Sequence, residues 1–96
     1  FQVVINANGT VFDQKDNKGP DWNGNYTLKT GREKGAWTLE LAIPWKTLGM
    51  DAPKAGTELG LNVCRNRVGA QQELTRWVDT GMFNYNPNRS GTLRFE

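Results

Sequence analysis

Side chains that could catalyse a reaction are scarce in this sequence. It contains no histidine, and it has a single cysteine, Cys64, and a single serine, Ser90. Imidazole is the usual proton carrier near neutral pH, and its absence excludes a Ser-His-Asp or Cys-His catalytic site. A Cys/His zinc site is excluded as well, because only one of the required ligands is present. The sequence also singles out no pair of carboxylates for hydrolytic chemistry. We therefore expect a protein that binds rather than catalyses, and not an enzyme.

The acidic side chains offer one set that could hold a metal ion. Asp13, Asp16 and Asp21 are close in the sequence, and calcium prefers several oxygen ligands. Their spacing does not match the EF-hand calcium loop, however, and two lysines lie among them. We expect no metal and no cofactor, with a structural calcium ion as the remaining alternative.

Charge and length restrict the possible partners. The 12 basic and 10 acidic residues leave a net charge of +2, which is too even for a dedicated nucleic-acid binder or a polybasic membrane anchor. No apolar run approaches the about 20 residues that span a bilayer. We expect neither nucleic acid nor a membrane as partner, and one small domain over residues 1–96. Because no basic segment leads an apolar stretch after Phe1, we expect an N-terminus that was processed or cut.

Short alternating runs separated by turn-forming residues predict an all-β fold. The sequence holds ten asparagines and 11 glycines, many of them in clusters between β-branched or aromatic runs. This rhythm is typical of an antiparallel sandwich or barrel. Asn8-Gly9 predicts a type I′ hairpin turn, in which both central residues have positive φ. Strands are predicted at residues 1–6, 10–13, 26–32, 37–43, 59–64, 74–78 and 93–95.

The clearest period-two pattern lies at residues 37–43, where apolar side chains alternate with smaller or polar ones. It predicts a half-buried strand. Residues 44–49 then predict one helical turn, with Pro44 at its first position and Gly49 in the left-handed conformation at its end.

The four tryptophans are predicted to differ in environment. Trp37 and Trp77 are expected in the core, and Trp45 is expected to anchor the helical turn. Trp22 lies in a polar loop over residues 14–25. We favour an anchoring role for Trp22 in that loop, and the alternative is an exposed platform for a ligand.

Five motifs occur in an order that resembles a known family. The most specific is WTLELAIPWKTLG at residues 37–49, a strand followed by a Pro-Trp turn. The others lie at residues 4–10, 22–24, 60–67 and 87–95. Together they resemble the family-9-type carbohydrate-binding modules over essentially the whole sequence.

The resemblance implies a fold and a function. The implied fold is an antiparallel β-sandwich, immunoglobulin-like or jelly-roll-like, and partial here because this chain looks like the C-terminal half of such a module. The implied function is non-catalytic binding of an oligo- or polysaccharide. The parent would be a larger secreted bacterial carbohydrate-active protein, located outside the cell or in the periplasm. The alternative is a structural or protein-interaction domain with no glycan ligand.

The resemblance also implies an aromatic contact in the loop at residues 82–86. In similar modules a clamp tryptophan comes from this loop, and here Phe83, Asn84 or Tyr85 takes its place. Such an aromatic ring would cover the apolar C–H face of a sugar. The alternative is that Phe83 plugs the end of the sandwich while Tyr85 lies over the loop.

Further sugar contacts are implied on a strand expected over residues 60–67. Cys64 stands where a glutamine of the family touches the sugar, and its thiol is a weak hydrogen-bond partner. Gln71 falls near the place of an arginine contact, and Asn62 and Asn66 share the parity of Cys64. The alternative is that these asparagines bond the backbone or each other. Nearby guanidinium groups could donate instead, from Arg65, Arg67 and Arg76.

The absence of the N-terminal half of such a module has a consequence for assembly. Removing strands from a sandwich leaves unpaired sheet edges and uncovers an apolar face. We therefore expect a homodimer that forms through exposed sheet edges, either side by side or by strand exchange.

Overall fold

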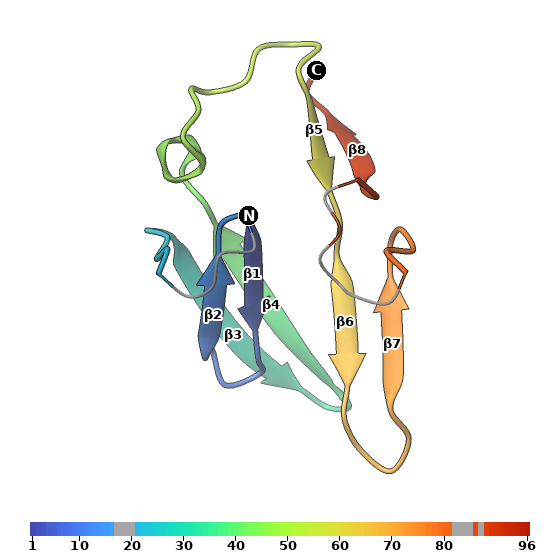
Figure 1. The fold of residues 1–96 in the computed structure, drawn as a ribbon. Helices are drawn as coiled ribbons and strands as arrows, with labels where there is room; N and C mark the ends of the chain where they lie inside the picture. Colours follow the sequence, from blue (N-terminus) through green and yellow to red (C-terminus); the bar gives the residue numbers. More distant parts are fainter. Residues whose placement is uncertain (17–20, 82–85, 87) are drawn as a thin grey trace. The chain divides into compact units, whose positions relative to one another are not determined.

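The computed structural model describes residues 1–16, 21–81, 86 and 88–96 (Figure 1). Within this part of the chain, all strand pairs are antiparallel and the one helical element is a short 3-10 turn, η1 (Trp45–Leu48). The predicted all-β class is therefore confirmed, with the elements of a β-sandwich. The strands are β1 (Gln2–Ile5), β2 (Val11–Gln14), β3 (Thr27–Glu33), β4 (Ala36–Ala42), β5 (Glu58–Leu61), β6 (Cys64–Arg67), β7 (Glu73–Arg76) and β8 (Gly91–Arg94).

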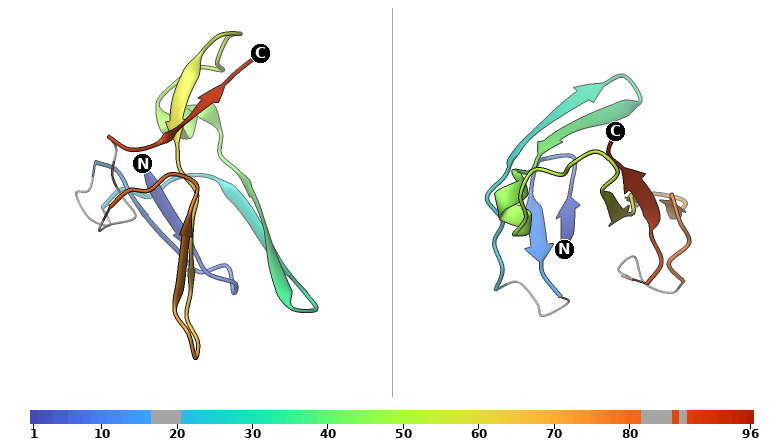
Figure 2. Two further views of the ribbon diagram at one scale, coloured as in Figure 1. Left: turned by 90° about the vertical axis from the view of Figure 1, so that its right-hand side faces the viewer. Right: turned by 90° about the horizontal axis from the view of Figure 1, so that it is seen from above.

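The described residues divide into two compact units, Phe1–Ala52 and Pro53–Glu96. The first unit contains the pairs β1–β2 and β3–β4, and the second contains β5–β8 and β6–β7. Figure 2 shows β3–β4 and β6–β7 as separate hairpins, each ending in its own turn. That residues 1–96 form a single domain stays a prediction.

The turn between β1 and β2 forms where it was predicted, but its type differs. Gly9 has a φ of 82°, whereas Asn8 is not among the described residues with positive φ, so the turn is not type I′. The side-chain oxygen of Asn6 accepts hydrogen bonds from the backbone N–H groups of Asn8 and Thr10, both at 3.0 Å. The Gly9 N–H also donates to the Asn6 carbonyl at 2.9 Å. These bonds close a longer loop, in which only the glycine needs the left-handed region.

The β3–β4 hairpin carries an apolar face that is covered only in part. Its register pairs Leu28 with Leu41 and Arg32 with Trp37, so these side chains share one face. The β1–β2 turn lies against this face, with Gly9 facing Leu28 and the Asn8 side-chain oxygen accepting from Arg32 at 2.7 Å.

The prediction that Trp37 is a core residue is wrong. Trp37 is 37% exposed, Leu39 and Leu41 are each 39% exposed, and no hydrophobic side chain of the described residues is fully buried. The physical reason is that the β1–β2 turn contacts Leu28 and Arg32 on β3 and leaves the apolar side chains of β4 partly exposed.

The helical turn forms as predicted, although Pro44 precedes it. Pro44 has a φ of −59° and a ψ of 139°, which is extended backbone, and its carbonyl accepts from the Thr47 N–H at 2.9 Å. Gly49 ends the turn in the left-handed region with a φ of 71°. The Thr47 hydroxyl donates to the Asn25 carbonyl at 2.5 Å, which ties the turn to the residues before β3.

Trp22 is half-buried and anchors its loop, as favoured from the sequence. Its ring contacts that of Phe1, with centroids 5.0 Å apart. On the same loop, Gly24 donates its N–H to Asp13 at 2.8 Å, and the Tyr26 hydroxyl donates to the same carboxylate oxygen at 2.7 Å. Aromatic packing and a buried carboxylate thus hold the loop against β2.

The strand expected over residues 60–67 is interrupted. β5 ends at Leu61 and pairs with β8, whereas β6 begins at Cys64 and pairs with β7. The Asn62 amide lies at the break, where its nitrogen donates to the Val78 carbonyl at 2.9 Å and its oxygen accepts from the Val78 N–H at 3.0 Å. The Asn62 side chain thus bonds both backbone polar groups of Val78, at the point where the partner strand changes from β8 to β7.

Candidate functional site

Two predicted site residues share one face of the β6–β7 hairpin. The register pairs Cys64 with Arg76 and Asn66 with Leu74, and directly opposed residues project to the same side of a sheet. The opposite face carries Arg65 and Arg67 with their partners on β7. We call the face formed by Cys64, Asn66, Leu74 and Arg76 the polar face. It offers an amide, a thiol and a guanidinium beside one exposed apolar side chain.

The groups on and near the polar face differ in how many hydrogen bonds they already make. Cys64 carries a free, half-buried thiol. Both polar atoms of the half-buried Asn62 side chain bond the backbone of Val78. This agrees with the alternative given above, in which the asparagine bonds the backbone. An amide oxygen has two lone pairs and an amide nitrogen two hydrogens, so Asn62 keeps one further bond on each atom.

Among the other predicted residues that the structure describes, Gln71 is not on the polar face. Gln71 is exposed in the loop between β6 and β7, at the end of the hairpin away from Asn62. Phe83, Asn84 and Tyr85 lie outside the described residues. The structure therefore groups Cys64 with Asn66, places Asn62 beside them at the strand break, and leaves Gln71 apart.

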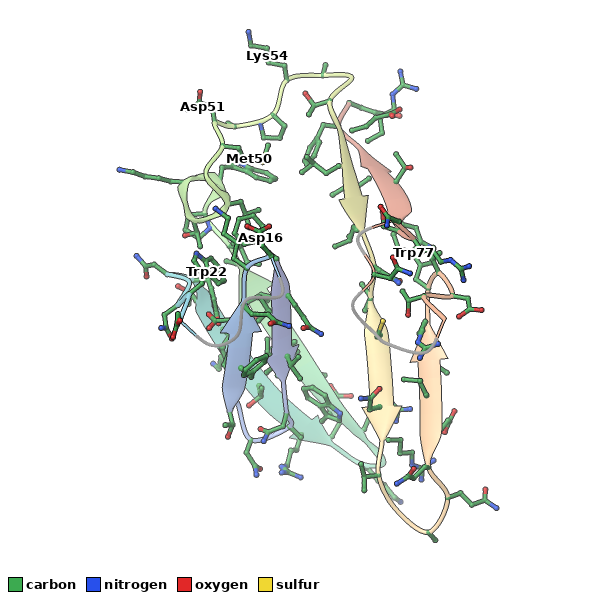
Figure 3. The ribbon with its side chains drawn as sticks, viewed as in Figure 1. Asp16, Trp22, Met50, Asp51, Lys54 and Trp77 are labelled. Atoms are coloured by element: carbon green, nitrogen blue, oxygen red, sulfur yellow. The ribbon has the colours of Figure 1, made fainter. Side chains whose placement is uncertain are left out.

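Trp77 is an exposed aromatic residue, so the prediction of a core position for it is wrong. It is 56% exposed, and it lies on the second unit near the ends of β7 and β8 (Figure 3). Its N–H donates to the Val63 carbonyl at 2.9 Å. The sequence did contain a signal, because Trp77 has the parity of the polar residues Glu73 and Thr75, which lie opposite the polar face.

The indole of Trp77 lies against the backbone of Gly91. A Cβ placed on Gly91 would stand 2.5 Å from the Cη2 atom of the indole and 2.6 Å from its Cζ3 atom. Only glycine leaves room for the ring at this distance. The indole therefore occupies the space that a side chain at position 91 would need.

Charged groups flank Trp77 in the sequence. Arg76 and Asp79 form an ion pair with an N–O distance of 3.3 Å. The Gly81 N–H donates to Asp79 at 2.9 Å and, together with the positive charge of Arg76, holds the pKa of the Asp79 carboxyl below its usual value. The carboxylate is therefore ionised throughout the neutral pH range.

Other features of the described residues lie apart from this region. A shallow depression follows η1 and is lined by Lys46, Gly49, Met50 and Asp51, of which Figure 3 labels the last two. Within the described ranges, no three side chains of the His, Cys, Asp or Glu type gather as metal ligands would. No helix in that part of the chain is long and apolar enough to cross a membrane.

The family model described as carbohydrate family 9 binding domain-like matches residues 1–96, and the chain belongs to this family. The resemblance drawn from the five motifs is thereby confirmed, and at the family level the chain is a carbohydrate-binding module. No curated protein and no solved structure matches the chain.

Proposed function

We propose that this chain is a non-catalytic module that binds an oligo- or polysaccharide for a larger secreted bacterial protein, outside the cell or in the periplasm. The observation that carries the proposal is the match of the carbohydrate-binding family over the whole of residues 1–96. The module would act without a metal or other cofactor. Its role would be to hold a partner catalytic domain near its substrate.

The binding site of this proposal uses the residues selected from the sequence. Asn66 and the remaining bonding capacity of Asn62 would bond sugar hydroxyls, since each amide both donates and accepts. Cys64 would make mainly van der Waals contact with the sugar, because its thiol is a weak hydrogen-bond partner. Gln71 would add a contact at the loop end of the hairpin. The separate loop at residues 82–86 would supply an aromatic or amide contact from Phe83, Asn84 or Tyr85.

A fluorescence titration tests this function. The four tryptophans of the purified chain report on the addition of mono- and oligosaccharides, each also supplied with a chemically reduced end. Saturable quenching by some sugars is expected, and loss of the signal on reduction would assign binding to the sugar end. A flat response across the panel from a folded chain would contradict the proposal and favour an interaction domain without a glycan ligand.

A pair of variants locates the site within that titration. Asn66→Ala removes an amide from the polar face, whereas Thr75→Ala removes a hydroxyl from the opposite face of β7. We expect Asn66→Ala to weaken binding about five- to tenfold, the effect of about one lost hydrogen bond, and Thr75→Ala to bind as the unchanged chain. Equal affinities for the two variants would move the site away from the polar face.

We also propose that the module assembles as a homodimer. The support is the exposure of large apolar side chains such as Trp37, Leu39 and Leu41, together with sheets of two strands whose outer edges are unpaired in those sheets. Light scattering at micromolar concentration is expected to give twice the mass of the chain. A monomer mass would contradict this part of the proposal without affecting saccharide binding.

A further inference from the structure

We infer that Asn8 is a site of spontaneous covalent modification, at which the side-chain amide is lost as ammonia and a carboxylate takes its place. Asparagine is a chemically labile side chain, and asparagine followed by glycine can cyclise onto the next backbone nitrogen with water as the only other reactant. The sequence contains two such pairs, Asn8-Gly9 and Asn23-Gly24. The two pairs lie in opposite electrostatic surroundings. This inference goes beyond the proposed function and does not depend on it.

The reaction consists of a cyclisation and a hydrolysis. In the first step the Gly9 nitrogen gives up its proton to hydroxide and attacks the Cγ atom of Asn8, which forms a new C–N bond. The side-chain nitrogen takes a proton from water and leaves as ammonia, and a cyclic succinimide remains. Water then breaks one of the two C–N bonds of that ring. The product is aspartate if the bond to Cγ breaks, and isoaspartate if the bond to the backbone carbonyl carbon breaks.

The first argument is that a positive charge lies beside Asn8. The Arg32 Nη2 atom donates to the Oδ1 atom of Asn8 at 2.7 Å. During the cyclisation, negative charge develops on the glycine nitrogen and then on this Oδ1 atom. A guanidinium that already bonds the oxygen stabilises that charge, as the donors of an oxyanion hole do. The Gly9 N–H donates to a neutral acceptor, the Asn6 carbonyl, at 2.9 Å.

The second argument is that a negative charge lies beside the other pair. The Gly24 N–H donates to the Asp13 carboxylate at 2.8 Å, and the Tyr26 hydroxyl donates to the same oxygen at 2.7 Å. Ionisation of an N–H next to a carboxylate is opposed by the repulsion of two negative charges, and it breaks a charge-assisted hydrogen bond. Cyclisation at Asn23 therefore starts from a nitrogen that is held in its neutral, hydrogen-bonded form.

The third argument concerns the room that each glycine has to move. The two asparagines are both exposed and the two glycines are both half-buried, so exposure does not distinguish the pairs. Packing distinguishes them, because a Cβ on Gly24 would lie 2.6 Å from the Tyr26 ring and 2.7 Å from the Trp22 ring. A Cβ on Gly9 would meet its nearest atom at 3.6 Å, an ordinary van der Waals distance. The Gly9 nitrogen is therefore less restricted in approaching the preceding side chain.

The modification changes how the β1–β2 turn is joined to β3. In the aspartate product, the neutral hydrogen bond acceptor at position 8 becomes a carboxylate, and its contact with Arg32 becomes an ion pair. In the isoaspartate product, the backbone of the turn gains a methylene group. Both products carry one more negative charge than the unmodified chain, so ion-exchange chromatography separates them from it.

Peptide mapping by mass spectrometry gives the direct test. The purified chain is incubated in neutral buffer, and cleavage after lysine then places the two asparagines in different peptides, residues 1–15 and 19–29. We expect Asn8 to convert about tenfold faster than Asn23 in the folded chain, the combined effect of one favourable and one unfavourable charge contact. In urea these contacts are lost, and the two rates are expected to approach each other.

Variants and salt test whether the charges cause the difference. Arg32→Met is expected to slow conversion of Asn8 about three- to fivefold without affecting Asn23, and Arg32→Lys, which keeps the charge, to retain part of the rate. Asp13→Asn is expected to accelerate conversion of Asn23. In the unchanged chain, about 1 M sodium chloride is expected to reduce the ratio of the two rates, because salt screens the exposed Arg32 contact. Retained amide dispersion is required of every variant.

Three results would overturn the inference. One is a folded chain in which Asn23 converts as fast as Asn8 or faster. Another is a folded Arg32→Met variant that converts Asn8 at the rate of the unchanged chain. The third is a ratio of rates in the unchanged chain that salt leaves as it was. None of these measurements uses a saccharide, so their outcomes are independent of the proposed function.

Discussion

At the scale of single residues, Gly24 shows how a loop can depend on the absence of a side chain. A Cβ at this position would lie 2.6 Å from the Tyr26 ring and 2.7 Å from the Trp22 ring. We expect Gly24→Ala to lower the free energy of unfolding by about 1–3 kcal/mol, as overpacking does. Urea denaturation measures the difference. Gly69→Ala is the control, because a Cβ there meets nothing within 4 Å and Gly69 has no positive φ, and an equal loss in both variants would contradict the packing argument.

Tyr26 gives a prediction that depends on pH. Burial, then the hydrogen bond to the Asp13 carboxylate and its negative charge, raise the pKa of Tyr26 from 10.0 to about 12. A raised pKa in the folded state means that the folded chain holds the proton more tightly than the unfolded chain. The resulting stabilisation is complete below pH 10 and is lost as the pH rises toward about 12.

Absorbance of the tyrosinate ion measures this ionisation. The chain has two tyrosines, so a Tyr85→Phe background leaves Tyr26 as the only one. Asp13→Asn in this background is expected to lower the pKa of Tyr26 because it removes the negative charge while burial remains. An unchanged titration midpoint in that variant would show that burial alone raises the pKa.

At the scale of elements, the change of partner between β5 and β6 depends on one amide. We expect Asn62→Ala to lower the free energy of unfolding by about 1–3 kcal/mol, because both backbone groups of Val78 lose a half-buried partner. Hydrogen exchange at the Val78 N–H is expected to accelerate in this variant more than exchange in the β1–β2 pair. Uniform acceleration along the chain would instead indicate global destabilisation.

The sequence predicted the elements better than their connections. Alternation located the strands of the β3–β4 hairpin, and Pro44 and Gly49 located the helical turn, because both elements depend on neighbouring residues. The type of the turn at Asn8-Gly9 was missed because the side chain of Asn6 closes the loop. The break at Asn62 was missed because its cause is a contact with Val78, which is distant in the sequence.

At the scale of the whole molecule, the candidate site was predictable only in part. The parity of Cys64 and Asn66 fixed their common face in advance, since it follows from the period of a strand. The environment of Trp77 did not follow from its apolar character. Its ring packs against Gly91 of β8, a residue that is distant in the sequence. Likewise, the alternation predicts which side chains of β4 share a face, whereas the exposure of that face does not follow from the alternation.

The break at Asn62 also bears on how this fold tolerates change. The β6–β7 hairpin begins at the Asn62–Val78 hydrogen bonds, next to the β5–β8 pair. The loop that joins β6 and β7 carries Val68, which is 84% exposed. Strand register is set at the clamped end, so residues inserted at the other end need not propagate into β5 or β8. The β6–β7 hairpin is therefore a place where loops of new length and sequence can be grafted at little cost to folding.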